Sequence, residues 1–212
     1  MRKVIKRKLY VISVPPKLSI EKIYDKIASS IRAPYAEISI RGGRAYIEIV
    51  GTEAEIKDSW NRVRNALQDL WELYRLETEK EALIESIVKE AGRTFPPESL
   101  VYALKLKGYD ARLSDDKQVL YTNAPPSVVV ELARRIAEII DEIRFRVKGT
   151  AAKRMVAAIA AGLDVDPEKV IEYGISTRVL EESDEGIVLR EEWRRALRKV
   201  AVMLKGAELG FE

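Results

Sequence analysis

Hydrophobic and polar positions follow two periods along the chain, and these periods predict where helices and strands lie. The longest apolar stripe has steps of four and three residues and consists of Ile56, Trp60, Val63, Leu67, Leu70 and Tyr74. Such spacing places the side chains on one face of a helix. We therefore expect a long helix that begins at Thr52 or Glu53. Five polar residues, 77–81, separate it from a second helical segment at 82–91.

Strand and turn signals precede this helix. Residues 8–14 form a β-rich run, and Ser19 is the expected N-cap of the helix that follows it. Two alternating runs, 35–40 and 45–50, flank the pair Gly42-Gly43. A glycine pair between such runs favours a two-residue hairpin, because a type I′ turn needs positive φ at both positions.

The rest of the chain alternates between helical and hairpin patterns. The predicted helices are 100–107, 127–147, 151–161, 166–173 and 191–205, and the predicted hairpins pair 109–113 with 118–122 and 178–182 with 186–190. The order helix, hairpin, helix thus recurs at roughly 19–75, 99–146 and 167–205. Identity among these segments is too low to establish a duplication.

This pattern predicts an α+β protein with antiparallel sheets. We expect an α/β sandwich module at 1–76, a second helix-hairpin-helix module at 77–147, and a winged-helix-like unit at 148–212. In the last of these, Asp166-Pro167 has the chemistry of a helix start. The helix that follows carries Glu168 and Glu172, and acidic side chains are poorly suited to a DNA groove.

The composition excludes several kinds of chemistry. The 212 residues include no histidine, no cysteine, three asparagines and two glutamines. The chain therefore lacks disulfides, thiol nucleophiles, imidazole bases and Cys-based zinc sites. Scarce amides with abundant Lys, Arg and Glu are typical of heat-adapted proteins, and we infer a thermophilic archaeal origin. We expect no catalytic residues, no metal and no cofactor.

Charge is distributed unevenly along the chain. Residues 1–76 hold 15 Lys/Arg and 9 Asp/Glu, a net charge of +6, whereas 77–147 and 148–212 have net charges of −2 and −1. A polyanion would therefore meet the N-terminal third first. No run approaches about 20 uninterrupted apolar residues, so we expect no membrane span and a cytoplasmic protein.

Basic residues gather at three places that suit a phosphate backbone. The candidate nucleic-acid-binding residues are Lys3, Lys6, Arg7 and Lys8 near the N-terminus, Arg41 and Arg44 at the glycine hairpin, and Arg144, Arg146, Lys148, Lys153 and Arg154 where the middle and last thirds join. Arginine holds phosphate bidentately, and basic arms gain affinity by counterion release. The alternative for each group is a solvated or ion-paired surface.

Two resemblances add to this interpretation. The strand, helix, hairpin, helix order of the first third resembles a KH or ferredoxin-like module in topology, although the G-x-x-G loop with which KH domains clamp nucleic acid is missing. The segments 148–150, 165–171 and 186–194 resemble an archaeal family of conserved proteins of unknown function. That resemblance implies an archaeal origin and carries no activity.

These observations lead to two hypotheses. The first is a non-catalytic nucleic-acid-binding protein with RNA as its expected partner, and Tyr46 beside Arg44 resembles the strand aromatics on which single-stranded RNA binders stack bases. The second is an interaction module or homodimer that uses the long helix, with Trp71, and the alanine-rich helix 151–161.

Overall fold

The computed structural model describes residues 4–16 and 18–208 and shows a mixed α+β protein with small antiparallel sheets, as the hydrophobic pattern predicts. The chain divides into two compact units, residues 1–78 and 79–212. The division into 1–76, 77–147 and 148–212 stays a prediction. Its second boundary falls inside the second compact unit.

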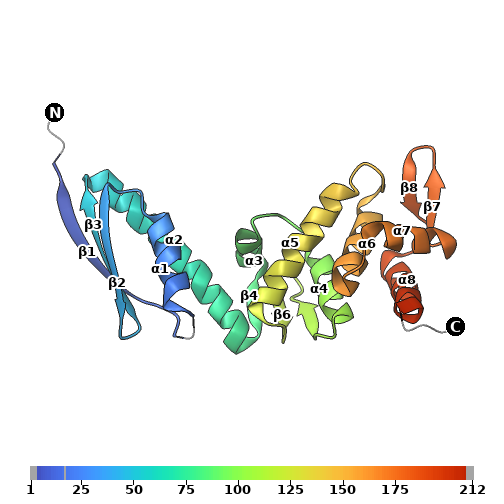
Figure 1. The fold of residues 1–212 in the computed structure, drawn as a ribbon, viewed down its shortest axis with the longest axis horizontal. Helices are drawn as coiled ribbons and strands as arrows, with labels where there is room; N and C mark the ends of the chain where they lie inside the picture. Colours follow the sequence, from blue (N-terminus) through green and yellow to red (C-terminus); the bar gives the residue numbers. More distant parts are fainter. Residues whose placement is uncertain (1–3, 17, 209–212) are drawn as a thin grey trace. The chain divides into compact units, whose positions relative to one another are not determined.

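The N-terminal unit is a three-stranded sheet with two helices on one face (Figure 1). Its elements are β1 (Lys6–Ser13), α1 (Ile20–Ser30), β2 (Tyr35–Arg41), β3 (Arg44–Gly51) and α2 (Glu53–Glu79). The strand order is β1-β3-β2, and both pairings are antiparallel. Ile47 and Ile49 of β3 pack with Ile23 of α1 and Leu67 of α2 in one core. The helices thus cover the face that bears the alternate, buried residues of each strand.

Local chemistry sets the ends of these elements. The Ser19 side chain accepts a hydrogen bond from the amide of Lys22, which confirms Ser19 as the N-cap of α1. At the start of α2, the Thr52 amide donates to the Glu55 carboxylate at 2.8 Å and the Glu55 amide donates to Thr52 Oγ1 at 3.4 Å, a capping box. Gly42 and Gly43 have φ of 58° and 70°, as the predicted type I′ turn requires.

The second unit contains two small sheets packed among helices. Its described elements are β4 (Glu81–Leu83), α3 (Ile84–Ala91), α4 (Pro97–Leu106), β5 (Ala111–Leu113), β6 (Val119–Thr122), α5 (Pro126–Glu142), α6 (Thr150–Leu163), α7 (Pro167–Ser176), β7 (Leu180–Ser183), β8 (Gly186–Leu189) and α8 (Trp193–Glu208). The alanine-rich α6 is its centre and packs against α4, α5, α7 and α8. Asp166 caps α7 by accepting from the Glu168 amide, as expected.

The strand order of the first sheet recurs in the second. In β1-β3-β2 and in β4-β6-β5, the earliest strand pairs antiparallel with the later strand of the hairpin. In the β7–β8 hairpin, too, the later strand pairs with an earlier part of the chain: Val147 forms a parallel bridge with Ile187 of β8. A shared strand order does not by itself establish a duplication, so the three predicted repeats remain a prediction.

Two predicted boundaries are wrong, and both fail because of pairing with residues distant in sequence. The sequence predicts a polar break at 77–81 and a helix from 82, but residues 81–83 form β4, in which Ala82 pairs with Leu120 of β6. The helix predicted to reach residue 147 ends at Glu142. Beyond it the Lys148 amide donates to the carbonyl of Ile187 at 2.7 Å, so this segment joins the β7–β8 hairpin instead.

Candidate nucleic-acid interface

The sheet of the N-terminal unit has a second face that neither α1 nor α2 covers, which we call the open face. Strand alternation places on it the odd-numbered residues of β1 and β2 and the even-numbered residues of β3. Apolar side chains there are unusually accessible: Leu9 is 57% exposed, Val11 48% and Tyr35 57%. Contiguous exposed apolar surface is a feature of binding faces, so the open face is a candidate site.

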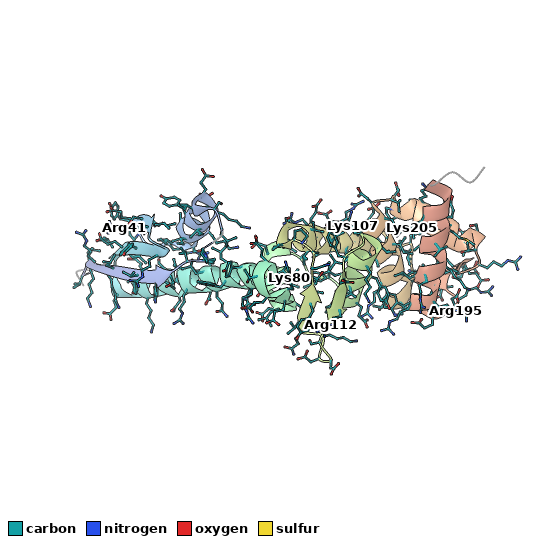
Figure 2. All side chains as sticks on the ribbon, turned by 90° about the horizontal axis from the view of Figure 1, so that it is seen from below. Arg41, Lys80, Lys107, Arg112, Arg195 and Lys205 are labelled. Carbon is teal, nitrogen blue, oxygen red and sulfur yellow. The ribbon has the colours of Figure 1, made fainter. Side chains whose placement is uncertain are left out.

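Tyr46 lies at the centre of the open face. It sits on the middle strand, directly opposite Val11 of β1 and Ser39 of β2. The guanidinium of Arg41, which Figure 2 labels, lies 4.6 Å from the centroid of the Tyr46 ring. This cation–π contact holds the arginine over the ring and leaves its remaining N–H groups for an acceptor.

Arg44 completes a cationic end to the open face. It is directly opposite Arg41 in the hairpin, an arrangement of like charges that is unfavourable unless an anion joins them. Among the described residues, neither guanidinium forms an ion pair with a carboxylate. The pairing of Arg41 with Arg44 confirms the prediction that these residues flank a hairpin tip. Their role in binding stays a prediction.

The far end of the open face is acidic and partly neutralised. Glu37 and Glu48 are directly opposite each other, and Arg7 Nε lies 2.6 Å from Glu48 Oε1. The hydrogen bond to Glu48 and the charge of that carboxylate raise the pKa of Arg7. Arg7 is thus tied to a glutamate, so the basic cluster predicted around it is less available than the sequence suggests.

The other lysines of that cluster lie elsewhere. Lys3 lies outside the described residues. Lys6 and Lys8 alternate with Arg7, so they belong to the helix-covered side of β1, where they line a groove against α2. Lys6 Nζ binds Glu53 at 2.8 Å. The N-terminal basic run is therefore divided between two faces of the sheet.

The basic cluster predicted at residues 144–154 is partly neutralised as well. Arg146 forms an ion pair with Glu168, and Arg154 Nη1 lies 3.2 Å from Glu98 Oε2. Arg144 lies over its neighbour Phe145, which is 74% exposed. Lys148 and Lys153 have no carboxylate partner among the residues that the structure describes.

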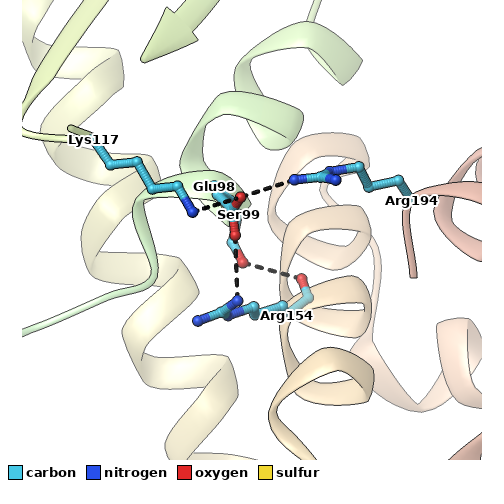
Figure 3. A network of polar contacts seen from close by, with 5 residues as sticks. All are labelled: Glu98, Ser99, Lys117, Arg154 and Arg194. Carbon is cyan, nitrogen blue, oxygen red and sulfur yellow. Dashed lines mark hydrogen bonds and ion pairs between the residues drawn. The ribbon is translucent and has the colours of Figure 1, made fainter. Parts of the chain in front are cut away.

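Glu98 is a focal residue that sequence reasoning missed. Its side chain is only 15% exposed, and Figure 3 shows Lys117, Arg154 and Arg194 converging on it. Burial alone would raise the pKa of Glu98, but the hydrogen bond from Lys117 and the charges of the three cations outweigh it and hold the pKa below its usual value. In the sequence, Glu98 is recognisable only as an acidic residue in the first turn of a helix, which does not reveal that three cations meet there.

A second arginine–tyrosine pair was also missed. Arg112 lies opposite Tyr121 across β5 and β6, and its guanidinium is 4.0 Å from the ring centroid. Tyr121 occupies the middle strand of its sheet, as Tyr46 does in the first. The pair had no distinctive sequence signal, because the two residues lie in separate short strands.

The surfaces named for the interaction hypothesis are largely buried within their own units. Val63, Leu67 and Leu70 of the long stripe are at most 1% exposed and belong to the core of the N-terminal unit. In α6, the residues from Met155 to Ala161 are all at most 3% exposed. A dimer that buried these residues would require the cores to open, whereas Trp60, Trp71 and Tyr74 of the same helix are partly exposed.

Within residues 4–16 and 18–208, no group of three or more acidic side chains converges where a metal ion would bind. None of the helices in this part of the chain combines the length and the apolar character needed to cross a membrane. The open face therefore remains the best-developed candidate site.

Comparison with known proteins places the chain in a family. Neither the curated proteins nor the solved structures yielded a match to it. The model of one family, described as "uncharacterized protein conserved in archaea (DUF2067)", matches residues 12–198. This range includes most of the open face and nearly all of the second unit. The chain therefore belongs to the DUF2067 family of proteins conserved in archaea, as the resemblance in its last third implied.

Proposed function

We propose that this protein binds single-stranded RNA on the open face of its N-terminal sheet and performs no catalysis there. The observation that carries the proposal is the cation–π pair of Arg41 with Tyr46 of the middle strand, beside Arg44, which has no carboxylate partner among the described residues. A base can stack on the Arg41–Tyr46 pair while the two guanidiniums hold adjacent phosphates. This combination of stacking and backbone charge is how sheet-based modules bind single strands.

The acidic end of the face favours RNA over DNA. Glu37, Glu48 and Ser39 have side-chain oxygens that can accept hydrogen bonds. The 2′-hydroxyl of RNA can donate such a bond, whereas deoxyribose cannot. Carboxylates also repel phosphates, so a bound strand would run with its backbone toward Arg41 and Arg44.

Acidic residues at the end of the second unit argue against binding of duplex DNA there. The order α6, α7, β7, β8 resembles a winged helix, and α7 would be the helix that enters a DNA groove. Glu168 of α7 and Glu181 of β7 are already paired with Arg146 and Arg190, and further acids remain in both elements. We therefore assign this winged-helix-like shape a structural role.

The second unit can extend the same mode of binding. Arg112 with Tyr121 repeats the arginine–tyrosine pair on a central strand, and Arg144 with exposed Phe145, near Lys148, adds a cationic aromatic surface. Each would contribute a further stacking position for a long strand.

The test is fluorescence anisotropy of a labelled, unstructured RNA 12-mer at several salt concentrations. Tyr46→Ala should weaken binding about 5- to 150-fold, the range that removal of one stacking platform produces, and Tyr46→Phe should retain most of the affinity. Arg41→Ala with Arg44→Ala should weaken binding and reduce the slope of log K against log salt by about 0.7 for each phosphate that is no longer neutralised.

Arg64→Ala is the matched control, because Arg64 is an exposed arginine of α2, the helix on the other side of the sheet. It should change the affinity by less than about twofold, as an exposed charge remote from the interface does. A chain that fails to bind the 12-mer at low salt, or whose affinity is the same in Tyr46→Ala and in the Arg64 control, rules the proposal out.

A further inference from the structure

A groove of about 450 Å³ runs between β1 and α2 in the N-terminal unit. Lys6, Arg7, Lys8 and Tyr10 line it from β1, and Lys57 and Trp60 line it from α2. Its volume falls within the range that small-molecule sites occupy. Neither Arg41, Arg44 nor Tyr46 lines the groove.

The charge of the groove is strongly positive. Glu53 is the one carboxylate among its described lining residues, and it binds Lys6. The hydrogen bond from Lys6 and its charge, with further contributions from Lys8 and Lys57, lower the pKa of Glu53. Three ammonium groups thus act on a single carboxylate, and Lys8 and Lys57 have no carboxylate partner of their own among the described residues.

One wall of the groove is a stacked aromatic pair. The rings of Tyr10 and Trp60 are 4.0 Å apart at their centroids and inclined by only 7°. Lys8 Nζ lies 5.2 Å from the centroid of the Tyr10 ring. A cation, a flat aromatic surface and two further lysines therefore meet in one cavity, which suits a ligand with a flat ring at one end and an anion at the other.

We propose that this groove binds a nucleotide, with the phosphate held by Lys6, Lys8 and Lys57 and the base packed against Tyr10 and Trp60. The phosphate would take the place of Glu53 as the partner of Lys6. The same chemistry is offered by a free nucleotide and by the terminal nucleotide of an RNA strand. The site lies on the helix-covered side of the sheet and is independent of Tyr46.

Calorimetric titration of the full chain with adenosine 5′-monophosphate tests the proposal. Lys8→Ala with Lys57→Ala should weaken binding about tenfold or more, because charged hydrogen bonds to the phosphate are removed. Glu53→Gln should instead tighten binding by about two- to fivefold, since it releases Lys6 from its carboxylate partner. Lys22→Ala with Arg64→Ala removes the same charge elsewhere in the unit and should have less than about a twofold effect.

Trp60 provides a second readout that locates the ligand. In a Trp71→Phe/Trp193→Phe background, the remaining tryptophan is Trp60, and the nucleotide should change its fluorescence. Tyr46→Ala should leave this change intact, so failure of the open face and failure of the groove are distinguishable. Adenosine, which lacks the phosphate, should bind about tenfold more weakly or worse.

The source of the nucleotide is decided by two RNA 12-mers, one with a 5′-phosphate and one with a 5′-hydroxyl. Tighter binding of the phosphorylated strand, reversed by adenosine 5′-monophosphate, supports a terminal nucleotide, and equal binding of the two strands supports a free nucleotide. No heat or fluorescence change with millimolar adenosine 5′-monophosphate overturns the proposal. Equal affinities for adenosine and its monophosphate, or unchanged affinity in Lys8→Ala/Lys57→Ala, also overturn it.

Discussion

Arg194 and Glu98 meet although they lie 96 positions apart in the sequence, and Arg194 Nη2 donates to Glu98 Oε1 at 2.9 Å. Lys117 from the β5–β6 turn and Arg154 from α6 reach the same carboxylate (Figure 3). The Ser99 hydroxyl next to it donates to the carbonyl of Arg154 at 3.2 Å. One acidic residue at the start of α4 therefore ties together three other parts of the second unit.

Replacement of Glu98 should destabilise the protein markedly. Glu98→Gln leaves three cations close together with no anion between them, and we expect the free energy of unfolding to fall by about 1.5–3 kcal/mol, the range for hydrogen bonds to a charged group. Urea denaturation followed by circular dichroism measures this decrease. Glu85→Gln is the matched control, because Glu85 forms an exposed pair with Lys89 one helical turn away and should change stability by at most about 0.5 kcal/mol.

The contribution of Glu98 should depend on pH in a defined direction. Its pKa is lowered in the folded protein relative to an ordinary value of 4.5, so the carboxylate stabilises the fold fully above that value. As the pH falls below 4.5 and through the folded pKa, protonation should remove the contribution. The difference in unfolding free energy between wild type and Glu98→Gln should thus be constant near neutral pH and shrink in acid. A difference that grows on acidification contradicts this assignment.

Gly162 should respond to alanine in the opposite way to Gly206. A Cβ added at Gly162 of α6 would lie 2.8 Å from Leu106 Cβ and 2.9 Å from Ala103 Cα, so α6 and α4 would have to separate. We expect Gly162→Ala to cost about 1–3 kcal/mol by overpacking. Gly206 of α8 has nothing within 4 Å of an added Cβ, and Gly206→Ala should stabilise by up to about 1 kcal/mol through helix propensity. If Gly162→Ala and Gly206→Ala shift the thermal unfolding temperature equally, the contact between α6 and α4 does not require glycine at position 162.

Ser59 should be essential to the turn after α1. It is fully buried, and its Oγ accepts hydrogen bonds from the amides of Arg32 at 3.1 Å and Ala33 at 3.0 Å. Ser59→Ala would leave both donors without this partner and should lower the free energy of unfolding by about 1–3 kcal/mol. Ser29→Ala, which removes an exposed hydroxyl that donates to the Lys26 carbonyl, should change stability by less than about 0.5 kcal/mol in the same assay.

Much of the secondary structure is accessible from local pattern. The stripe from Ile56 to Tyr74 predicts the long helix, Ser19 marks the N-cap of the helix before it, and Gly42-Gly43 indicates the first hairpin. These features are predictable because helix faces, caps and tight turns depend on residues within about four positions of one another. β4 is not, because three residues acquire strand geometry only when β6 lies beside them.

Sequence alone determined the excluded chemistry, the positive N-terminal third, and the hairpin that presents Arg41 and Arg44. Only the tertiary structure decided which charges are already paired: Arg154 and Arg146 bind glutamates 56 and 22 residues away, while Lys6 and Arg7 divide between the two faces of one sheet. It also brought Lys57 and Trp60 to β1 and three cations to Glu98.

The physical reason is the distance over which each interaction is determined. An ion pair or a groove depends on distance in space, and that distance is set by how sheets and helices pack, which the order of residues along the chain does not reveal.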